Sequence, residues 1–287
     1  MKEIIKKYWK WGAGIFILSC CGLGGYIAHF ELRAQVLEVY FFDLERGRSV
    51  FIRTPHNQTV LIDGGQNSQV LRELTKVLPF YRRRIDTVIV TNSPAKNTGG
   101  LSEVVRRYDV RRIFEPVIMG TSTALAALKK EIAHKNLTPE SLQKGDSFEI
   151  DGVKFEVLFP DPSFKFNKTS MSELVLLISY FDTKILLLGD VSKTIQKSFI
   201  PGVDHADIIE YAHSAGDSRT SGDLFIQLKP KYAIIKKQIR APSTRVAKNL
   251  PKKPPFNIEK QEGIEATNLE KEGTARFSID EKGIKKQ

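Results

Sequence analysis

Short apolar runs separated by turn residues recur along most of the chain, and they predict alternating strands and helices. Strand patterns span 34–55, 56–65, 85–91, 111–117, 147–160, 172–190, 205–214 and 231–237, with a final hairpin around 273–284. Apolar positions at helical spacing span 67–83, 99–110, 121–136 and, more briefly, 221–228. Strands in two successive groups with helices between them predict a layered α/β domain, in which helices cover two sheets.

The first thirty residues follow a different pattern. Residues 11–30 contain no Lys, Arg, Asp or Glu, and about 20 apolar residues suffice to span a bilayer as a helix. Four lysines precede the run, so the positive-inside rule predicts a cytoplasmic N-terminus and a single-pass protein of the cell membrane with an extracytoplasmic domain. The expected segments are a basic stretch at 1–10, a transmembrane anchor at 11–30, one domain at 31–280 and a flexible tail at 281–287.

Two other interpretations of the N-terminal segment remain open. Residues 17–20 (ILSC) loosely resemble a lipoprotein cleavage box, which would make Cys20 a lipidated N-terminus and would still tether the domain on the outer face. A cleaved signal peptide also begins with a basic and then an apolar stretch.

Composition and charge narrow the function classes. An apolar share of 41% and a charged share of 27% are normal for a folded globular protein. The two cysteines, Cys20 and Cys21, are adjacent, which excludes a disulfide framework and a Cys-rich zinc site. A net charge of +11 favours anionic partners such as nucleic acid or lipid headgroups. A merely soluble basic surface is the alternative.

An ordered series of motifs carries a resemblance. The series is FFDLERGRSVFIRTP, VLIDGG, IDTVIVTNSPAKNTGGL, SELVLLISYFDTKILLLGDVSK, DIIEYAHSAGDSRTS and LKPKYAIIK. It resembles, over nearly all of residues 35–280, the metallo-β-lactamase-type domain of the ComEC family of competence DNA-uptake proteins. The resemblance implies a four-layer αββα sandwich, here preceded by one transmembrane helix. It also implies a metal site in active members, which hydrolyse phosphodiesters or related bonds.

The metal-binding loop of that family reads Thr-His-x-His-x-Asp-His-x-Gly-Gly. Thr91 and the Gly pair at 99–100 match it, whereas the four ligand positions hold Asn92, Pro94, Lys96 and Asn97. Proline has no side-chain ligand, and an ammonium a few ångströms from a divalent ion is repelled by several kcal/mol, as an order of magnitude. The resemblance therefore predicts no bound metal, no cofactor and no catalytic residue.

Other positions of the implied site are also depleted. Asp190 matches the family's bridging aspartate and His213 the first His of its His-His-Gly-Ser block, while Ala241 replaces a later His. Arg48 stands where the family's Gly-Gln-Gly-Asp turn has its acid. Asp43 and Asp63 match family acids that we interpret as structural.

Basic residues suggest a binding role instead. Residues 229–260 hold ten Lys or Arg against one acid. By the resemblance, Lys236, Lys237 and Arg240 would border the former cleft together with Arg48 and Lys96. Such a groove could hold a phosphate backbone electrostatically. A solvated charged face is the alternative.

Three functions follow as hypotheses. The leading one is a membrane-tethered, catalytically degenerate protein that binds DNA or another polyanion and is related to competence DNA uptake. The second is an active metal-dependent hydrolase or nuclease with an atypical site around Asp190 and His213. The third is an envelope scaffold that binds a protein partner.

Overall fold

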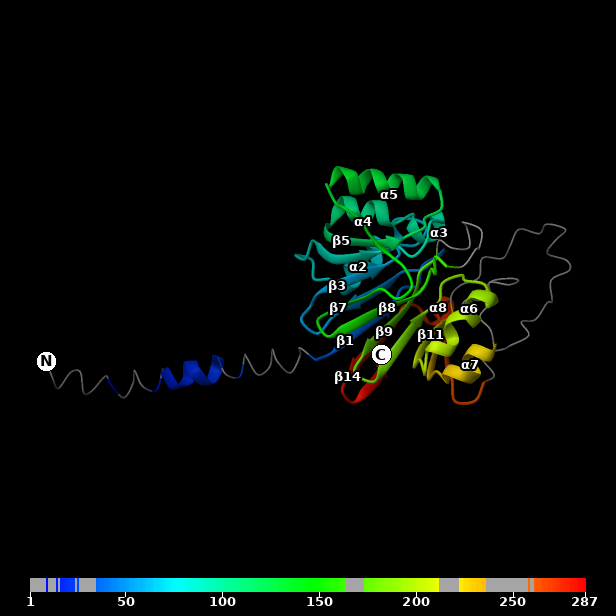
Figure 1. Ribbon diagram of the computed structural model, residues 1–287. Helices are drawn as coiled ribbons and strands as arrows, with labels where there is room; N and C mark the ends of the chain where they lie inside the picture. Colours follow the sequence, from blue (N-terminus) through cyan, green and yellow to red (C-terminus); the bar gives the residue numbers. More distant parts are fainter. Residues whose placement is uncertain are drawn as a thin grey trace.

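The computed structural model describes residues 35–163, 173–211, 222–235 and 261–287, with Ile258 and the N-terminal positions 9, 14, 16–23 and 25. These residues form two β-sheets packed face to face, with helices on both outer faces (Figure 1). The first sheet has eight strands in the order β15-β14-β1-β2-β3-β4-β5-β6, and the second has seven in the order β13-β12-β11-β10-β9-β8-β7. The expected layered sandwich is therefore confirmed.

The elements have the following bounds. The first sheet contains β1 (Leu37–Phe41), β2 (Val50–Arg53), β3 (Thr59–Ile62), β4 (Arg84–Ile89), β5 (Asp109–Pro116), β6 (Glu140–Leu142), β14 (Ala275–Asp280) and β15 (Gly283–Lys286). The second contains β7 (Ser147–Ile150), β8 (Val153–Phe159), β9 (Val175–Tyr180), β10 (Thr183–Leu187), β11 (Ile208–Tyr211), β12 (Tyr232–Ile235) and β13 (Glu265–Asn268). The helices are α2 (Gln69–Val77), α3 (Ala95–Thr98), α4 (Leu101–Arg107), α5 (Thr123–His134), α6 (Lys193–Phe199), α7 (Gly222–Leu228) and α8 (Leu269–Glu272).

Strand β1 shows why the chain forms layers. Leu37, Val39 and Phe41 belong to the apolar cluster between the sheets, whereas Tyr40 belongs to the cluster beneath the helices of the first sheet. Successive side chains of a strand point to opposite faces, so a strand that is apolar at nearly every position must be covered on both sides. Helices α2, α4 and α5 cover the first sheet, and α6 and α7 cover the second (Figure 1).

Strand direction gives the sandwich two distinct ends. β1 and β3 both run antiparallel to β2, and β4 and β5 run parallel to β3, so β1, β3, β4 and β5 all begin at one edge. The second sheet is tied to the same edge, because Tyr180 at the end of β9 donates its hydroxyl hydrogen bond to the carbonyl of Gln35, at 3.1 Å. We call this edge the Gln35 end and the opposite edge the site end.

Several predicted boundaries differ from the structure. The helix expected over 67–83 ends at Val77, because Leu78 precedes Pro79 and a residue before proline is disfavoured from helical geometry. The short helices α3 and α6 were not predicted. Residues 281–287, expected as a flexible tail, contain β15, which pairs with β14, so the domain boundary at 280 is wrong. The hairpin predicted around 273–284 is confirmed.

In the part of the chain that the structure describes, no helix is long and apolar enough to cross a membrane. The expected anchor at 11–30 lies only partly within that part.

Candidate functional site: an arginine among carboxylates

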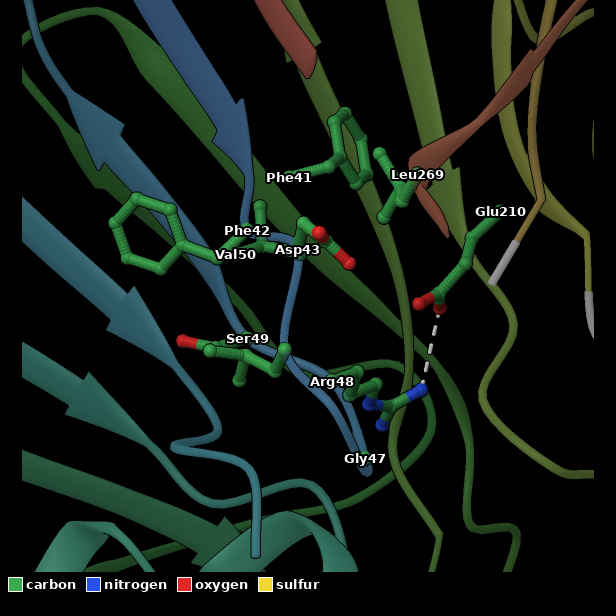
Figure 2. A pocket seen from close by; sticks show the side chains of 10 residues that line it. Phe41, Phe42, Asp43, Gly47, Arg48, Ser49, Val50, Glu210 and Leu269 are labelled. Carbon is green, nitrogen blue, oxygen red and sulfur yellow. Dashed lines mark hydrogen bonds and ion pairs between the residues drawn. The ribbon is translucent and has the colours of Figure 1, made fainter. Parts of the chain in front are cut away.

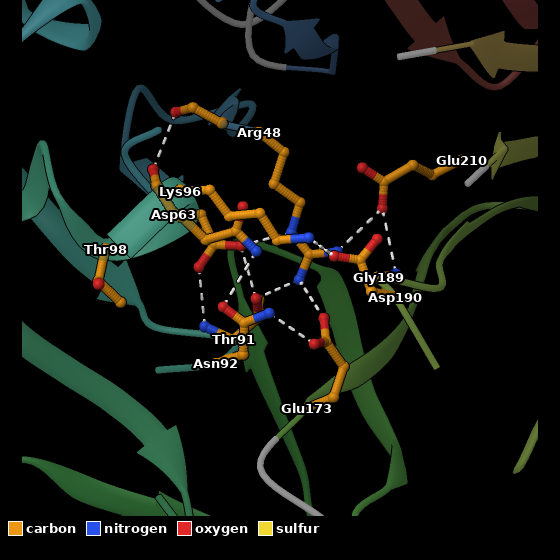
Figure 3. Close-up of polar contacts among 12 residues, drawn as sticks. Arg48, Asp63, Thr91, Asn92, Lys96, Thr98, Glu173, Gly189, Asp190 and Glu210 are labelled. Atoms are coloured by element: carbon orange, nitrogen blue, oxygen red, sulfur yellow. Dashed lines mark hydrogen bonds and ion pairs between the residues drawn. The ribbon is translucent and has the colours of Figure 1, made fainter. Parts of the chain in front are cut away.

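The side chain of Arg48 occupies the site end of the sandwich, where the loops after β3, β4 and β10 meet (Figure 3). Arg48 lies just before β2 and is 4% exposed. Its Nη2 donates to Glu173 Oε1 at 2.9 Å and its Nη1 to Glu210 Oε2 at 3.2 Å. Its Nε donates to the Asp63 carboxylate, and Nη2 also donates to the Thr91 hydroxyl. One guanidinium thus contacts three carboxylates, drawn from both sheets.

Asp63 is held in place by the loop that follows β4. Its Oδ1 accepts from the Thr91 backbone N–H at 2.9 Å, and its Oδ2 accepts from the Thr91 hydroxyl at 2.5 Å. The Thr91 hydroxyl therefore accepts from Arg48 and donates to Asp63, which uses both of its hydrogen-bonding roles. Thr91, the first residue of the loop, thereby holds Asp63 in position for its ion pair with Arg48.

The two asparagines of the loop continue this network. Asn97 Nδ2 donates to Asn92 Oδ1 at 3.0 Å, and Asn92 Nδ2 donates to Glu173 Oε2 at 2.5 Å. Both amides are buried, at 3% and 2% exposure. A chain of hydrogen bonds therefore runs from Asn97 through Asn92 and Glu173 to Arg48. The amides at these two positions of the predicted ligand loop complete the hydrogen bonding of a carboxylate.

Lys96 provides a second cation at the rim of the site. Its ammonium forms an ion pair with the Asp190 carboxylate, and the two side chains are 41% and 32% exposed. Pro94, at another position of the predicted ligand loop, is the N-cap residue of α3 and has an extended conformation. The structure thus brings Asn92, Lys96 and Asp190 to the same site.

Electrostatics keep Arg48 charged and shift Glu173. Burial alone would lower the pKa of Arg48, but Asp63, Glu210 and Glu173 hold that pKa well above its ordinary value. Burial raises the pKa of Glu173 to about 7, Arg48 opposes this rise, and the neighbouring charge of Asp190 adds to it. A buried carboxylate near two other acids is costly to ionise, so Glu173 titrates near neutral pH.

Two glycines permit this dense packing. Gly189 has φ +61°, and a Cβ there would overlap the Glu173 carboxylate and press on Arg48 Nη1. Gly47 has φ +83°, and a Cβ there would overlap the backbone carbonyl of Lys96. Both positions combine a left-handed backbone with close approach, which only glycine tolerates without strain.

A small cavity lies beside Arg48. A cavity of ≈ 10 Å³ adjoins it, lined among others by Asp43, Glu210 and Leu269 (Figure 2). Roughly 10–15 Å³ on this measure is needed to hold a single water. This cavity therefore holds one water molecule at most.

A metal ion does not fit the side chains of this site that the structure describes. Within the described residues, no group of three or more His, Cys, Asp or Glu is arranged to hold a metal. Three of the four acids at the site already accept hydrogen bonds from Arg48, and Asp190 pairs with Lys96. A dication would have to displace two fixed cations, so these side chains do not support metal-dependent chemistry.

The predicted site residues fall into two groups. Arg48, Asn92, Pro94, Lys96, Asn97 and Asp190 lie at the site end. His213, Lys236, Lys237, Arg240 and Ala241 lie outside the described residues. The role predicted for Arg48, as part of an exposed cationic groove, does not fit its burial among carboxylates.

Sequence reasoning missed Glu173 and Glu210. Glu210 lies in the apolar strand β11 and is 1% exposed, and Glu173 lies two residues before the apolar strand β9. An acid within or beside a fully buried strand requires a partner, because burying an unpaired charge is very costly. The acids at positions 173 and 210, each in an apolar stretch, could therefore have indicated a buried ion pair with Arg48.

Comparison with solved structures identifies the fold. The metallo-β-lactamase fold protein YhfI from Bacillus subtilis matches 70% of this chain and 86% of its own, with a TM-score of 0.51 and 14% identity. This chain has the metallo-β-lactamase fold. A weaker likeness, with a TM-score of 0.46 and 16% identity, is to CmlA, a diiron β-hydroxylase from Streptomyces venezuelae, over 70% of this chain and 44% of that one.

Sequence comparison gives one distant relationship. The chain is 26% identical over 239 residues to ComE operon protein 3 of Bacillus subtilis (strain 168). The match covers 75% of this chain but only 30% of that protein, so this metallo-β-lactamase-fold chain corresponds to less than a third of its relative. No family model matches the chain.

Proposed function

We propose that this protein is a non-catalytic metallo-β-lactamase-fold protein that binds a polyanion such as DNA at the outer face of the cell membrane. The observation that supports the absence of catalysis is the guanidinium of Arg48, which is bonded to Asp63, Glu173 and Glu210 inside the site. A bound metal supplies hydroxide near neutral pH by lowering the pKa of a water molecule. An arginine in place of the metal cannot activate water in this way, because it has no coordination position for a water molecule and its guanidinium stays protonated.

The binding half rests on charge and on the distant relationship. The chain carries +11 net charge, and a basic protein attracts nucleic acid by neutralising phosphates and releasing counterions. The chain is also homologous over 75% of its length to ComE operon protein 3. In this proposal Lys236, Lys237 and Arg240 supply the binding surface, and Lys96 lies at its rim, where it is paired with Asp190. Arg48 is structural.

Metal analysis tests the proposal that the site binds no metal and is non-catalytic. The full chain, purified without chelators and then incubated with zinc, manganese or ferrous ions, should hold far less than one metal per chain after desalting. Near-stoichiometric metal together with phosphodiester hydrolysis would establish the active-hydrolase alternative instead.

A filter-binding titration tests the proposal that the protein binds DNA. DNA affinity should fall steeply with salt, and alanine at Lys236 and Lys237 together should lower the slope of log K against log salt by about 1 to 2. Alanine at Arg112, an exposed residue of β5 paired with Glu140, is the matched control. Absence of salt-sensitive binding in the wild type would favour a scaffold that binds a protein partner.

A further inference from the structure

The Gln35 end of the sandwich carries exposed aromatic side chains. Phe80 and Tyr81, in the loop between α2 and β4, are 89% and 75% exposed, and their rings meet edge to face at 5.5 Å. Phe181, in the turn between β9 and β10, is 51% exposed. Both segments belong to the Gln35 end, because the loop leads directly into Arg84 at the start of β4 and the turn follows Tyr180, which bonds to Gln35. Three of the five large exposed hydrophobic residues in the described part of the domain lie there.

The same end receives the chain from the apolar N-terminal segment. The described side chains of that segment are all exposed, including Phe16 at 70% and Leu18 at 74%, so they do not pack on the described domain. From residue 30 to Gln35 the chain can extend by roughly 18 Å at most. The proposed function places the protein at the outer face of the membrane, and the sequence predicts an anchor at residues 11–30. If these residues cross a bilayer, the Gln35 end therefore lies next to its surface.

The aromatic loop lies on that edge, within reach of the same surface. β4 is separated from β1 by two strands, and three strand spacings of about 4.8 Å place Arg84 on the order of 14 Å to the side of Leu37. Aromatic residues are favoured at the boundary between headgroups and acyl chains, where a ring with a polar tip such as tyrosine finds both environments. We propose that the Phe80–Tyr81 loop and Phe181 rest in the interfacial layer of the lipid bilayer and orient the domain with its site end facing away from the membrane.

Charge at this end favours lipid over a nucleic acid strand. Arg82 is paired with Asp86 at 2.9 Å and Arg84 with Asp109 at 3.4 Å, so two of the three consecutive arginines at positions 82–84 already have a carboxylate partner. A strand of nucleic acid requires a continuous cationic groove with ring faces open for stacking. An edge-to-face aromatic pair beside paired arginines offers neither, whereas it suits insertion into a zwitterionic or weakly anionic interface.

This inference rests on the tether of the proposed function, so the first measurement separates the two. The full chain is mixed with vesicles of phosphatidylcholine and phosphatidylglycerol and floated on a density gradient after a wash at alkaline pH. Retention on the vesicles supports the tether. Loss of the chain from the vesicles overturns the tether and this inference together, but leaves the metal and DNA tests unaffected.

Photo-crosslinking then tests the loop itself. The photoreactive amino acid p-benzoylphenylalanine replaces Phe80 or, as a matched control, Val117, which is 43% exposed and follows the last residue of β5 at the site end. In vesicle-bound full chain, Phe80 should crosslink to lipid at least fivefold more than Val117. Equal yields, or crosslinks from position 80 to protein or nucleic acid, would overturn the orientation while the flotation result still stands.

Hydrogen exchange gives an independent readout. Amides of residues 80–83 should exchange severalfold more slowly in vesicles than in detergent for the wild type. A Phe80→Ser, Tyr81→Ser variant should remain on the vesicles but lose that protection, since the altered side chains are exposed and their loss does not disturb the core. Equal protection in wild type and variant would show that the loop does not contact lipid through these rings.

Discussion

The guanidinium of Arg48 and the carboxylate of Glu210 are 162 positions apart in the chain and 3.2 Å apart in space. The contact joins the two sheets at the site end, because Arg48 precedes β2 and Glu210 lies in β11. It also makes a fixed cation the centre of the site. Three buried acids of the site are thus paired with a cation that comes from the protein's own sequence.

Loss of the Arg48 charge should destabilise the domain. Arg48→Ala leaves the carboxylates of Asp63, Glu173 and Glu210 buried without their partner, and breaking a buried ion pair costs about 3–5 kcal/mol. Chemical denaturation of the wild type and the variant measures this change in the free energy of unfolding. Arg112→Ala, in an exposed pair with Glu140, should change it by about 1 kcal/mol or less. Similar losses in both variants would contradict the role of Arg48.

Glu173 should make stability depend on pH. Because the folded-state pKa is raised from 4.5 to about 7, the folded protein binds more protons than the unfolded chain between those values. The stability that this group contributes is therefore present at low pH and lost as pH rises through about 7, by an amount on the order of 3 kcal/mol.

Glu173→Gln isolates that effect. The variant cannot ionise at this position, so the wild type should lose stability relative to it as pH rises from 4.5 to above 7. Thermal or denaturant unfolding at a series of pH values measures the difference. Parallel curves for the two proteins would show that Glu173 titrates as an ordinary carboxyl.

Rebuilding the ligand loop should restore metal binding only if Arg48 is also replaced. A variant with Asn92→His, Pro94→His, Lys96→Asp and Asn97→His still carries the Arg48 guanidinium beside the metal position. Adding Arg48→Asp should tighten zinc affinity by at least tenfold, since a nearby like charge costs several kcal/mol as an order of magnitude. Zinc titration of both variants, checked for folding by circular dichroism, measures this. Equal affinities would show that Arg48 does not obstruct the site.

The backbone at Gly189 should tolerate no side chain. Gly189→Ala would strain a left-handed residue and drive a methyl group into the Glu173 carboxylate, so we expect a loss of about 2–4 kcal/mol in the free energy of unfolding. Gly145→Ala is the matched control, because Gly145 has φ +93° but open space around it. Its loss should be about 1 kcal/mol. Equal losses would mean that only the backbone conformation matters at both positions.

Much of the fold could be predicted from apolar periodicity, as in β1, where nearly every residue is buried and two covered faces follow directly. The short helix α3 could not, because its four residues show no period and form only where the loop packs against its neighbours. At the site, the absence of histidine from the loop 91–100 could be read from the sequence. The partners of Arg48 could not be predicted in this way, since Glu173 and Glu210 are remote in sequence and belong to no motif.

The sequence by itself determined that the ligand loop holds Asn92, Pro94, Lys96 and Asn97, because the chemistry of a metal ligand depends on residue type alone. Only the tertiary structure decided that Arg48 turns inward rather than lining an open groove. The direction of that side chain depends on where two sheets place three acids, and the free energy of burying a charge is favourable only with all of those partners in position.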